Sequence, residues 1–322
     1  MLISAPEQTL ILKKAILKTI AFFDLFDYPL TSYELWRNLE GDWEYQTVRT
    51  YLNHLLEAPG GSRLAGESWS ETGQKILEIR HGFYFLPGRR EIVSWRQKRH
   101  NYSAEKVKIA RRFARVFSWL PWVQAIFLAN SQGFYNLRAA SDIDFFIISS
   151  PGRLWLSRLY CTGFAQLLRR RPTPADKRNK ICLSFYLAAD HLNIDDLRLS
   201  GADPYFDYWR RQLILLYNKN NTYNNFLKAN RLSLDEGREL SGKTSDTNYS
   251  FSKINWRLFI KFFDFFERLA KRWQLKIMPA GLKEAAGQSD GVVISDQVLK
   301  FYQGDRRREY AKKYEQKIRE IS

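Results

Sequence analysis

Two aspartates separated by a single residue are the side chains in this sequence best suited to chemistry. Asp142 and Asp144 stand at the start of the apolar run 145–148, FFII, which is typical of a buried strand. In an extended chain, alternate side chains leave the same face, so the two carboxylates would lie about 7 Å apart along the backbone. Carboxylate oxygens are ligands of Mg²⁺, and substrate phosphates commonly complete its coordination shell. The spacing therefore predicts a divalent-metal site at the end of a strand.

A second apolar run comes before the aspartates and ends in a polar turn. Residues 125–128, AIFL, predict a strand, and Asn130 and Ser131 follow it. Ser131 lies eleven residues before Asp142, at the expected start of a short helix, where backbone N–H groups can receive a phosphate. The parts of a phosphoryl-transfer site would thus meet at one corner of a sheet.

About 25 residues around the aspartates resemble the signature of the polymerase-β-like nucleotidyltransferases. In that family an apolar strand and Gly-Ser are followed, after about a dozen residues, by Asp-x-Asp and a second apolar strand. The resemblance implies that Ser131 and nearby backbone amides hold a nucleoside triphosphate, while Asp142 and Asp144 bind Mg²⁺ or Mn²⁺. Ser141 and the basic Arg138 also fit the Ser-Asp-x-Asp context of the family.

The chain departs from this family pattern at two positions. Asn130 replaces the usual glycine, although asparagine tolerates the left-handed backbone conformation well and Gly133 adds freedom nearby. The family also takes a third carboxylate from a later strand, whereas the run 181–188, ICLSFYLA, contains no acid and would direct Cys182 or Ser184 to the site. Two further candidate ligands come directly after that run, namely Asp190 and His191.

Two functional interpretations follow from this pattern, and both stay open. The first is two-metal transfer of a nucleoside monophosphate from a nucleoside triphosphate to an acceptor that the sequence does not identify. The second is a related protein with reduced or no transferase activity, which acts as a nucleic-acid-binding regulator or a nucleotide sensor. The missing third carboxylate favours the second interpretation.

Basic residues are concentrated after the helix expected at 153–171. The segment 169–180 carries six basic residues and one acid. Three of them are candidate phosphate ligands beside the metal site, namely Lys177, Arg178 and Lys180. A solvated basic loop is the alternative.

The composition indicates a globular protein with a polyanionic partner. Of the 322 residues, 45% are hydrophobic and 15% aromatic, which allows a large core in two or three domains. A formal net charge of +17 favours nucleic acid or a negative membrane surface as the partner. Cys161 and Cys182 lie in or beside apolar segments without metal-ligand spacing, so we expect reduced thiols rather than a disulfide. Neither a signal-peptide pattern nor a run of 18 apolar residues occurs, so we expect no transmembrane segment and a cytoplasmic location.

The first part of the chain, residues 8–88, resembles a winged helix-turn-helix domain. Helices are expected at 9–28, 31–39 and 44–57, followed by a hairpin at 76–86. In such domains the third helix enters the major groove of DNA. The residues expected to contact nucleic acid are Gln46, Thr47, Arg49, Thr50, Arg80, Arg89 and Arg90. A protein-binding or interdomain role is the alternative.

Three further regions complete the expected domain organisation. A basic linker helix would span 89–122, a nucleotidyltransferase-like core 123–200, and a mainly helical region 201–322. Within the last region we expect a helix at 205–217 and a flexible polar linker at 231–250. The expected fold class is therefore α/β (α+β), with a mixed sheet and flanking helices between a winged helix-turn-helix and a helical region.

The tail is expected to contain an amphipathic helix at 254–273, INWRLFIKFFDFFERLAKRW. Its apolar positions form one broad face and are 254, 258, 262, 265, 266 and 269. This face would pack against the body of the protein, against a protein partner, or against a second copy in a dimer; a basic amphipathic helix can also lie on anionic lipid. A strand at 291–295 and a charged helix at 296–321 follow. In this helix four residues would add to a basic surface, namely Lys300, Arg306, Arg307 and Arg308.

Overall fold

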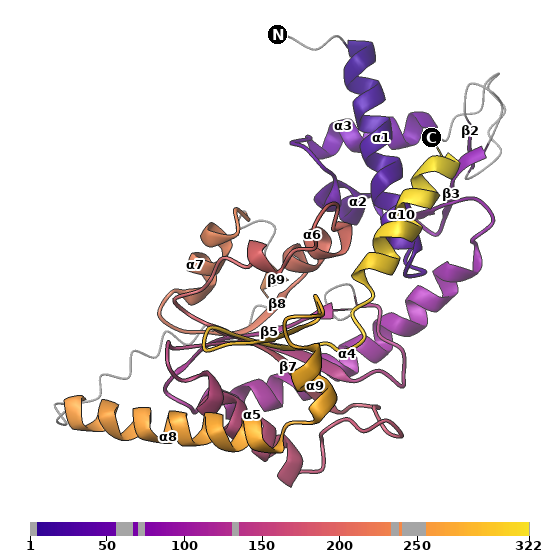
Figure 1. The fold of residues 1–322 in the computed structure, drawn as a ribbon. Coiled ribbons are helices and arrows are strands. Elements are labelled where there is room, and N and C mark those ends of the chain that lie inside the picture. The colour runs from indigo at the N-terminus through magenta and orange to yellow at the C-terminus, as the bar shows by residue number, and fades with distance from the viewer. Residues whose placement is uncertain are drawn as a thin grey trace. The chain divides into compact units, whose positions relative to one another are not determined.

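The computed structural model describes residues 5–55, 67–69, 75–130, 135–232, 238–239 and 256–321 (Figure 1). The chain combines helices with sheets and divides into two compact units. The first unit comprises residues 1–100 and 307–322, and the second comprises residues 101–306, so the second is inserted into the first. None of the helices described is long and apolar enough to span a membrane.

In its described residues, the first unit begins with three helices and a small antiparallel sheet. The elements are α1 (Ala5–Asp24), β1 (Leu30–Thr31), α2 (Ser32–Asn38), α3 (Tyr45–Leu55), β2 (Glu67–Trp69), β3 (Lys75–Arg80) and β4 (Phe83–Phe85), and the strand order is β1-β4-β3-β2. A capping box starts α2, because the Thr31 hydroxyl accepts from the Glu34 N–H and the Glu34 carboxylate accepts from the Thr31 N–H. His81 and Gly82, both with positive φ, form the two-residue turn between β3 and β4. The order of three helices and a hairpin agrees with the sequence prediction.

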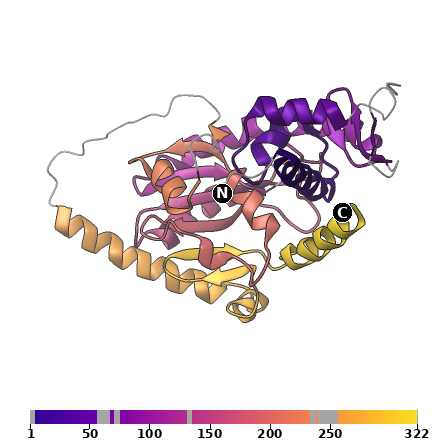
Figure 2. The same cartoon turned by 90° about the horizontal axis from the view of Figure 1, so that it is seen from above.

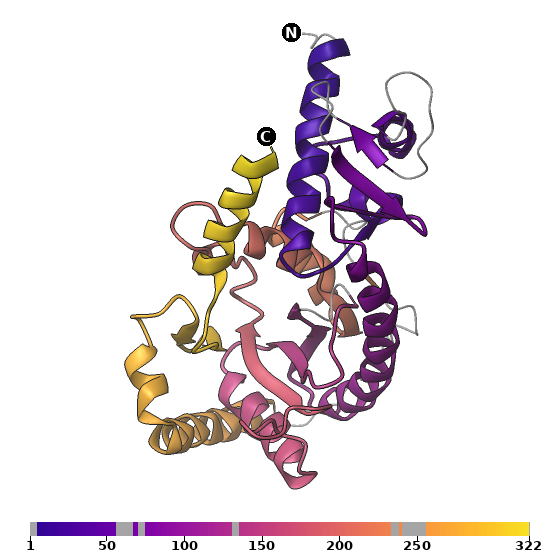
Figure 3. The same cartoon turned by 90° about the vertical axis from the view of Figure 1, so that its right-hand side faces the viewer.

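A helix from the far end of the chain completes the first unit. Helix α10 (Arg307–Ile321) packs beside α1 (Figure 3). The ring of Tyr314 contacts the ring of Phe22 edge-on, with centroids 6.1 Å apart. Lys317 Nζ lies 2.7 Å from Oδ2 of the buried Asp24. These contacts join residues that are almost the whole chain apart.

Seven described strands form a mixed sheet at the centre of the second unit. They are β5 (Val123–Leu128), β6 (Ile143–Ser149), β7 (Ile181–Ala188), β8 (Ile214–Asn218), β9 (Arg238–Glu239), β10 (Val292–Ile294) and β11 (Val298–Phe301), in the order β10-β11-β7-β6-β5-β8-β9. Strands β6 and β7 run parallel, as do β8 and β9, whereas the other neighbours are antiparallel. Because α5 (Leu154–Leu167) connects β6 to β7, these two strands start at the same edge of the sheet.

Helices cover both faces of this sheet. Alternate residues of β5 and β6 point to opposite sides, and β5 is buried along its whole length. On one face, Ile126 and Phe145 pack with the second half of α4 (Glu91–Phe117), with α5 and with α8 (Trp256–Ile277). On the other face, Phe127 and Phe146 pack with α6 (Pro204–Arg211) and α7 (Thr222–Ala229). Figure 1 shows α5 and α8 on one side of the sheet and α6 and α7 on the other, with the short α9 (Ala280–Ala285) after α8.

The helix predicted at 205–217 is wrong in its second half. Helix α6 ends at Arg211, and residues 214–218 form β8, which pairs antiparallel with β5. Ile214 and Leu215 are buried in the sheet by this pairing. An apolar run of this length is compatible with a helix or with a strand. The segment forms a strand because it can pair with the free edge of β5. The linker predicted at 231–250 lies mostly outside the described residues.

The charged helix predicted at 296–321 is also wrong in its first part. Residues 298–301 form β11, which pairs with β7, and α10 begins only at Arg307. Lys300 therefore lies in a strand and is buried, with its Nζ 3.5 Å from Asp305 Oδ2. It does not contribute to a basic surface.

Helix α8 packs against α5 through polar rather than aromatic side chains. The Glu267 carboxylate accepts from the N–H groups of Trp155 and Leu156, at 2.8 and 2.9 Å, in the first turn of α5. Gln274 Nε2 donates to the carbonyl oxygen of Trp155 at 2.8 Å, and Gln274 Oε1 accepts from the Arg158 guanidinium. The predicted apolar face is exposed at all its described positions, so its packing against the body of the protein is wrong.

Replacing Glu267 tests this helix contact. Glu267→Ala removes the acceptor of two N–H groups at the start of α5, so we expect a loss of about 2 kcal/mol in the free energy of unfolding. Urea unfolding followed by circular dichroism measures the change. Glu284→Ala, at an exposed position of α9, is the control and should change stability by less than about 0.5 kcal/mol. Equal stability of the wild type and Glu267→Ala would contradict this role.

Candidate metal centre

The site lies where polar side chains replace aromatic ones along one face of the sheet. On the face covered by α6 and α7, the rings of Phe146 in β6 and Phe185 in β7 touch, with centroids 4.5 Å apart. Asp144 lies on the same face of β6, nearer its start, and pairs in register with Cys182 of β7. Asp142 directly precedes β6. Because β6 and β7 are parallel, these three residues gather at their common starting edge.

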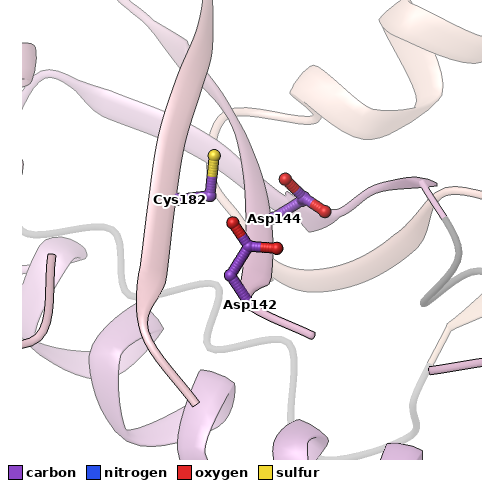
Figure 4. Close-up of side chains that lie close together, drawn as sticks. All are labelled: Asp142, Asp144 and Cys182. Atoms are coloured by element: carbon purple, nitrogen blue, oxygen red, sulfur yellow. The ribbon is translucent and has the colours of Figure 1, made fainter. Parts of the chain in front are cut away.

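Two carboxylates and a thiol lie close together at this edge (Figure 4). One ligand atom from each of Asp142, Asp144 and Cys182 lies within 4.8 Å of the others. Such a group could hold one divalent cation, in which the oxygens suit Mg²⁺ or Mn²⁺ and the sulfur suits a softer ion. The spacing of the aspartates thus predicted correctly that they lie close together. Cys182 is the third side chain of this group.

The surroundings favour the neutral form of both carboxyl groups. Burial, and then the negative charge of Asp142, raise the pKa of Asp144 to about 7. Burial also raises the pKa of Asp142, although neighbouring cations oppose this rise; they are Lys177, Lys106 and Arg171. The protein therefore compensates the negative charge of the site only in part, and a divalent cation fits this donor set.

Asn130 connects the end of β5 to the site. It adopts the left-handed backbone conformation, with φ 58°. Its Oδ1 accepts from Trp209 Nε1 at 3.1 Å, and its Nδ2 donates to the Tyr302 hydroxyl at 3.3 Å. The same side chain hydrogen-bonds to Asp144 and lowers its pKa, against the larger effect of burial. Asn130 thus turns the chain and orients a carboxylate at the same time.

The thiol of Cys182 and the phenol of Tyr302 lie beside Asp144, and both are protonated. Burial and the charge of Asp144 raise the pKa of Cys182 well above its ordinary value, and the same causes raise the pKa of Tyr302. Cys182 Sγ donates to the Ser184 hydroxyl at 3.3 Å. Both groups therefore keep their protons at neutral pH.

Lys106 on α4 joins the segments that carry the ligands. Its side chain is buried, and its Nζ donates to Ala139 O at 3.2 Å, Ser141 O at 2.6 Å and Asn179 Oδ1 at 2.7 Å. All three donors of the ammonium are thus used. Ser141 directly precedes Asp142, and Asn179 lies just before β7. Lys106 therefore fixes the approach of the chain to both strands.

The loop before β7 contributes two exposed cations. Lys177 is exposed, and its charge opposes the rise in the pKa of Asp142, so it lies near the aspartates. Arg178 is exposed as well. Lys180 instead pairs with Asp176, with its Nζ 3.0 Å from the carboxylate Oδ2. Of the three predicted phosphate ligands in this loop, Lys177 and Arg178 present their charge to solvent.

The other candidates for the site have different outcomes. Ser131 and Gly133 fall outside the described residues. Arg138 is exposed in the loop that leads to the aspartates. Asp190 and His191 follow the opposite end of β7, whose last residue, Ala188, lies about 20 Å from Cys182 along the strand. The alternative that these two residues complete the metal site is therefore wrong.

In the first unit, the predicted nucleic-acid contacts divide into exposed and paired side chains. Those on α3 and at the hairpin are exposed, namely Gln46, Thr47, Arg49, Thr50 and Arg80. Arg89 Nη2 lies 2.6 Å from Asp27 Oδ1, and Arg90 Nε lies 2.7 Å from Glu78 Oε2. Arg89 and Arg90 therefore each form an ion pair within the unit, and the side chain of Arg90 is also 58% exposed.

Three residues that shape the site were not predicted from the sequence, namely Lys106, Trp209 and Tyr302. A signal exists for Lys106, because it lies four residues before Ala110 and seven before Phe113, on the apolar stripe of α4. A lysine on such a stripe must find buried acceptors. Trp209 and Tyr302 reach the site only through helix packing and strand pairing, which no local pattern reveals.

Comparison of the chain with protein-family models, with curated proteins and with solved structures finds no match. We therefore infer the chemistry of the site from its own side chains. Two carboxylates and a thiol, with exposed cations on the adjacent loop, make it a candidate for binding a divalent cation together with a phosphorylated ligand.

The raised pKa of Asp144 predicts how the stability of the metal-free protein changes with pH. The folded state keeps the proton of the Asp144 carboxyl up to about pH 7, whereas an aspartate in the unfolded chain releases its proton near pH 3.8. Because the folded state binds more protons between these values, the contribution of this group is fully present below about pH 4. It is lost at up to about 1.4 kcal/mol per pH unit as the pH rises toward 7.

Urea unfolding in EDTA at a series of pH values measures this contribution. Asp144→Asn should remove it and should be more stable than the wild type near pH 7. Asp190→Asn, which changes an exposed acid beyond the far end of β7, should keep the wild-type pH dependence. Identical pH profiles for the wild type and Asp144→Asn would show that the pKa of this carboxyl is not raised.

Proposed function

We propose that this protein is a metal-dependent nucleotidyltransferase of the polymerase-β-like kind. It transfers a nucleoside monophosphate from a nucleoside triphosphate to an acceptor hydroxyl. The observation that carries the proposal is the meeting of Asp142 and Asp144 with the left-handed turn at Asn130, at the adjoining ends of two antiparallel strands. The resemblance of residues 125–149 to that family and the mixed sheet covered on both faces support it.

Each residue has a defined role in this proposal. Asp142 and Asp144 hold Mg²⁺ or Mn²⁺, which when bound neutralises triphosphate charge and acidifies the acceptor hydroxyl. The family resemblance assigns the binding of the phosphates to Ser131 and nearby backbone amides. Lys177 adds positive charge from the loop before β7. The acceptor hydroxyl loses its proton to solvent, and its oxygen bonds to the α-phosphorus while the bond from that phosphorus to the bridging oxygen breaks, so that pyrophosphate leaves.

For the first unit we propose a winged-helix module that binds nucleic acid. The order of α1, α2, α3 and the β3–β4 hairpin supports this, as does the pairing of β1 with β4. The exposed face of α3 offers Gln46 and Arg49 to bases and phosphates, and Arg80 at the hairpin offers a phosphate contact. The formal net charge of +17 favours such a polyanionic partner.

A nucleotide sensor or nucleic-acid-binding regulator is the second candidate function. The observation that favours it is the thiol of Cys182 at the third ligand position, where a carboxylate would bind Mg²⁺ more strongly. Transferase activity would then be reduced or absent. The transferase and the nucleotide sensor both require a bound nucleotide, and pyrophosphate release separates these two.

Pyrophosphate release is the direct test of the transferase. The wild type is incubated with Mg²⁺ or Mn²⁺, each nucleoside triphosphate, and pooled RNA, DNA and protein acceptors. We expect release that Asp142→Asn/Asp144→Asn lowers by at least about a hundredfold, because the charge that positions the phosphates is lost. Asp190→Asn/Asp196→Asn, a matched pair of exposed acids beyond the opposite end of β7, should keep wild-type activity.

Binding of a fluorescent nucleotide, followed in parallel, separates the remaining outcomes. Binding that depends on the two aspartates, without release in any acceptor pool, would favour the sensor over the transferase. If the protein shows no nucleotide binding and no pyrophosphate release, both functions are ruled out for this site.

The identity of the third ligand gives a further prediction. Cys182→Asp should lower the Mg²⁺ concentration that supports half-maximal nucleotide binding by about tenfold, because a carboxylate binds this hard cation better than a thiol. Anisotropy of the fluorescent nucleotide during a Mg²⁺ titration measures the change. Cys182→Ser, which supplies no charge, is the control and should stay close to the wild type. A higher Mg²⁺ requirement for Cys182→Asp would place residue 182 outside the coordination shell.

A further inference from the structure

Helix α8 presents a row of apolar side chains to solvent. In its described part these residues are between 37% and 58% exposed, namely Phe262, Phe265, Phe266, Leu269, Trp273 and Ile277. They recur at spacings of three and four, so they form one stripe about 23 Å long. An exposed apolar stripe of this length marks an interaction site. Figures 1 and 2 show α8 as a long helix whose first turns extend past the sheet of the second unit.

The opposite face of α8 fixes the direction of this stripe. There Glu267 accepts from two N–H groups at the start of α5, and Gln274 donates to Trp155 O. Turning the helix to bury the stripe would leave those N–H groups without an acceptor and would expose the buried Ala270 and Met278. The stripe is therefore a permanent outward surface of the second unit.

Cations line one flank of the stripe. Arg268, Arg272 and Lys276 are exposed at a spacing of four residues, so they form a row beside it. Within the described ranges, none of the three has an acidic partner. The acids of the same part of α8 are engaged, because Asp264 lies 2.7 Å from an arginine just before α5 and Glu267 binds the start of α5. The exposed flank thus carries uncompensated positive charge.

We propose that α8 docks the protein on an anionic lipid surface. The helix lies in the plane of the interface, with its aromatic stripe among the headgroups and its basic flank at the lipid phosphates. Aromatic side chains suit this depth, and each cation near the surface adds attraction to anionic lipid. The docking is independent of the proposed nucleotidyl transfer, because it involves none of the metal-site residues.

Charge argues against a second copy of the chain as the occupant. In an antiparallel pair of α8 helices related by two-fold symmetry, the same flank of both helices meets. Arg268, Arg272 and Lys276 of one copy would then face the same cations of the other. An anionic lipid surface carries the opposite charge and attracts this flank.

Vesicle sedimentation of the full chain tests the docking. The wild type is mixed with phosphatidylcholine vesicles with and without phosphatidylglycerol, at low and high salt. We expect binding at least about tenfold stronger to the vesicles that contain phosphatidylglycerol, and weaker binding at high salt. Phe265→Ser/Leu269→Ser and Arg268→Glu/Arg272→Glu/Lys276→Glu should each weaken this binding about tenfold.

A matched control separates docking by α8 from attraction by net charge. Lys108→Glu/Arg111→Glu/Arg112→Glu makes the same change of charge on the exposed side of α4 and should bind like the wild type. All the substituted side chains are exposed, and circular dichroism should show unchanged folding. No lipid dependence in the wild type, or an equal loss in the α4 control, would overturn the proposal. A dimer in light scattering that Phe265→Ser/Leu269→Ser converts to a monomer would also overturn it and would assign the stripe to a second copy.

Discussion

The buried ammonium of Lys106 is the interaction on which the geometry of the metal centre depends. Moving a charged amine out of water is costly unless each of its N–H groups finds an acceptor, and here Ala139, Ser141 and Asn179 supply all three. Hydrogen bonds to a charged group are worth about 1.5–3 kcal/mol each. The ammonium can reach its acceptors only if the loops before β6 and β7 stay together. The same bonds therefore position the residues that follow, Asp142 and Cys182.

The metal centre gathers more negative charge than its protein neighbours balance. Asp142 and Asp144 repel each other in a partly buried site, and both carboxyl groups hold their protons more firmly than exposed ones do. Cation binding must displace these protons, so metal affinity, pH and folding are linked at one place. Behind the site, the buried rings of Phe146 and Phe185 continue the same face of the sheet.

The strands that carry the centre were the elements most open to prediction. Short apolar runs bounded by turns indicate buried strands, and those at 125–128, 145–148 and 181–188 are β5, β6 and β7. Strand β8 was not predicted, because its apolar residues continue the pattern of α6 with hardly a break. The spacing of the apolar residues predicted the amphipathic character of α8. The direction in which its apolar face points was not predictable, because it depends on the hydrogen bonds between the polar face of α8 and α5. Tyr302 could not be assigned to the site, since its place follows from the order of strands in the sheet.

The return of α10 to α1 makes the first unit depend on a late stage of protein synthesis. Asp24 and Lys317, which form an ion pair, are 293 residues apart. A ribosome that adds about 5–20 residues per second needs roughly 15–60 s to make the second partner after the first. Throughout that interval Phe22 and Phe26 lack the tyrosine rings of α10 that pack on them. The nascent chain therefore displays an aromatic surface that a chaperone can bind while the whole inserted unit is translated and folds.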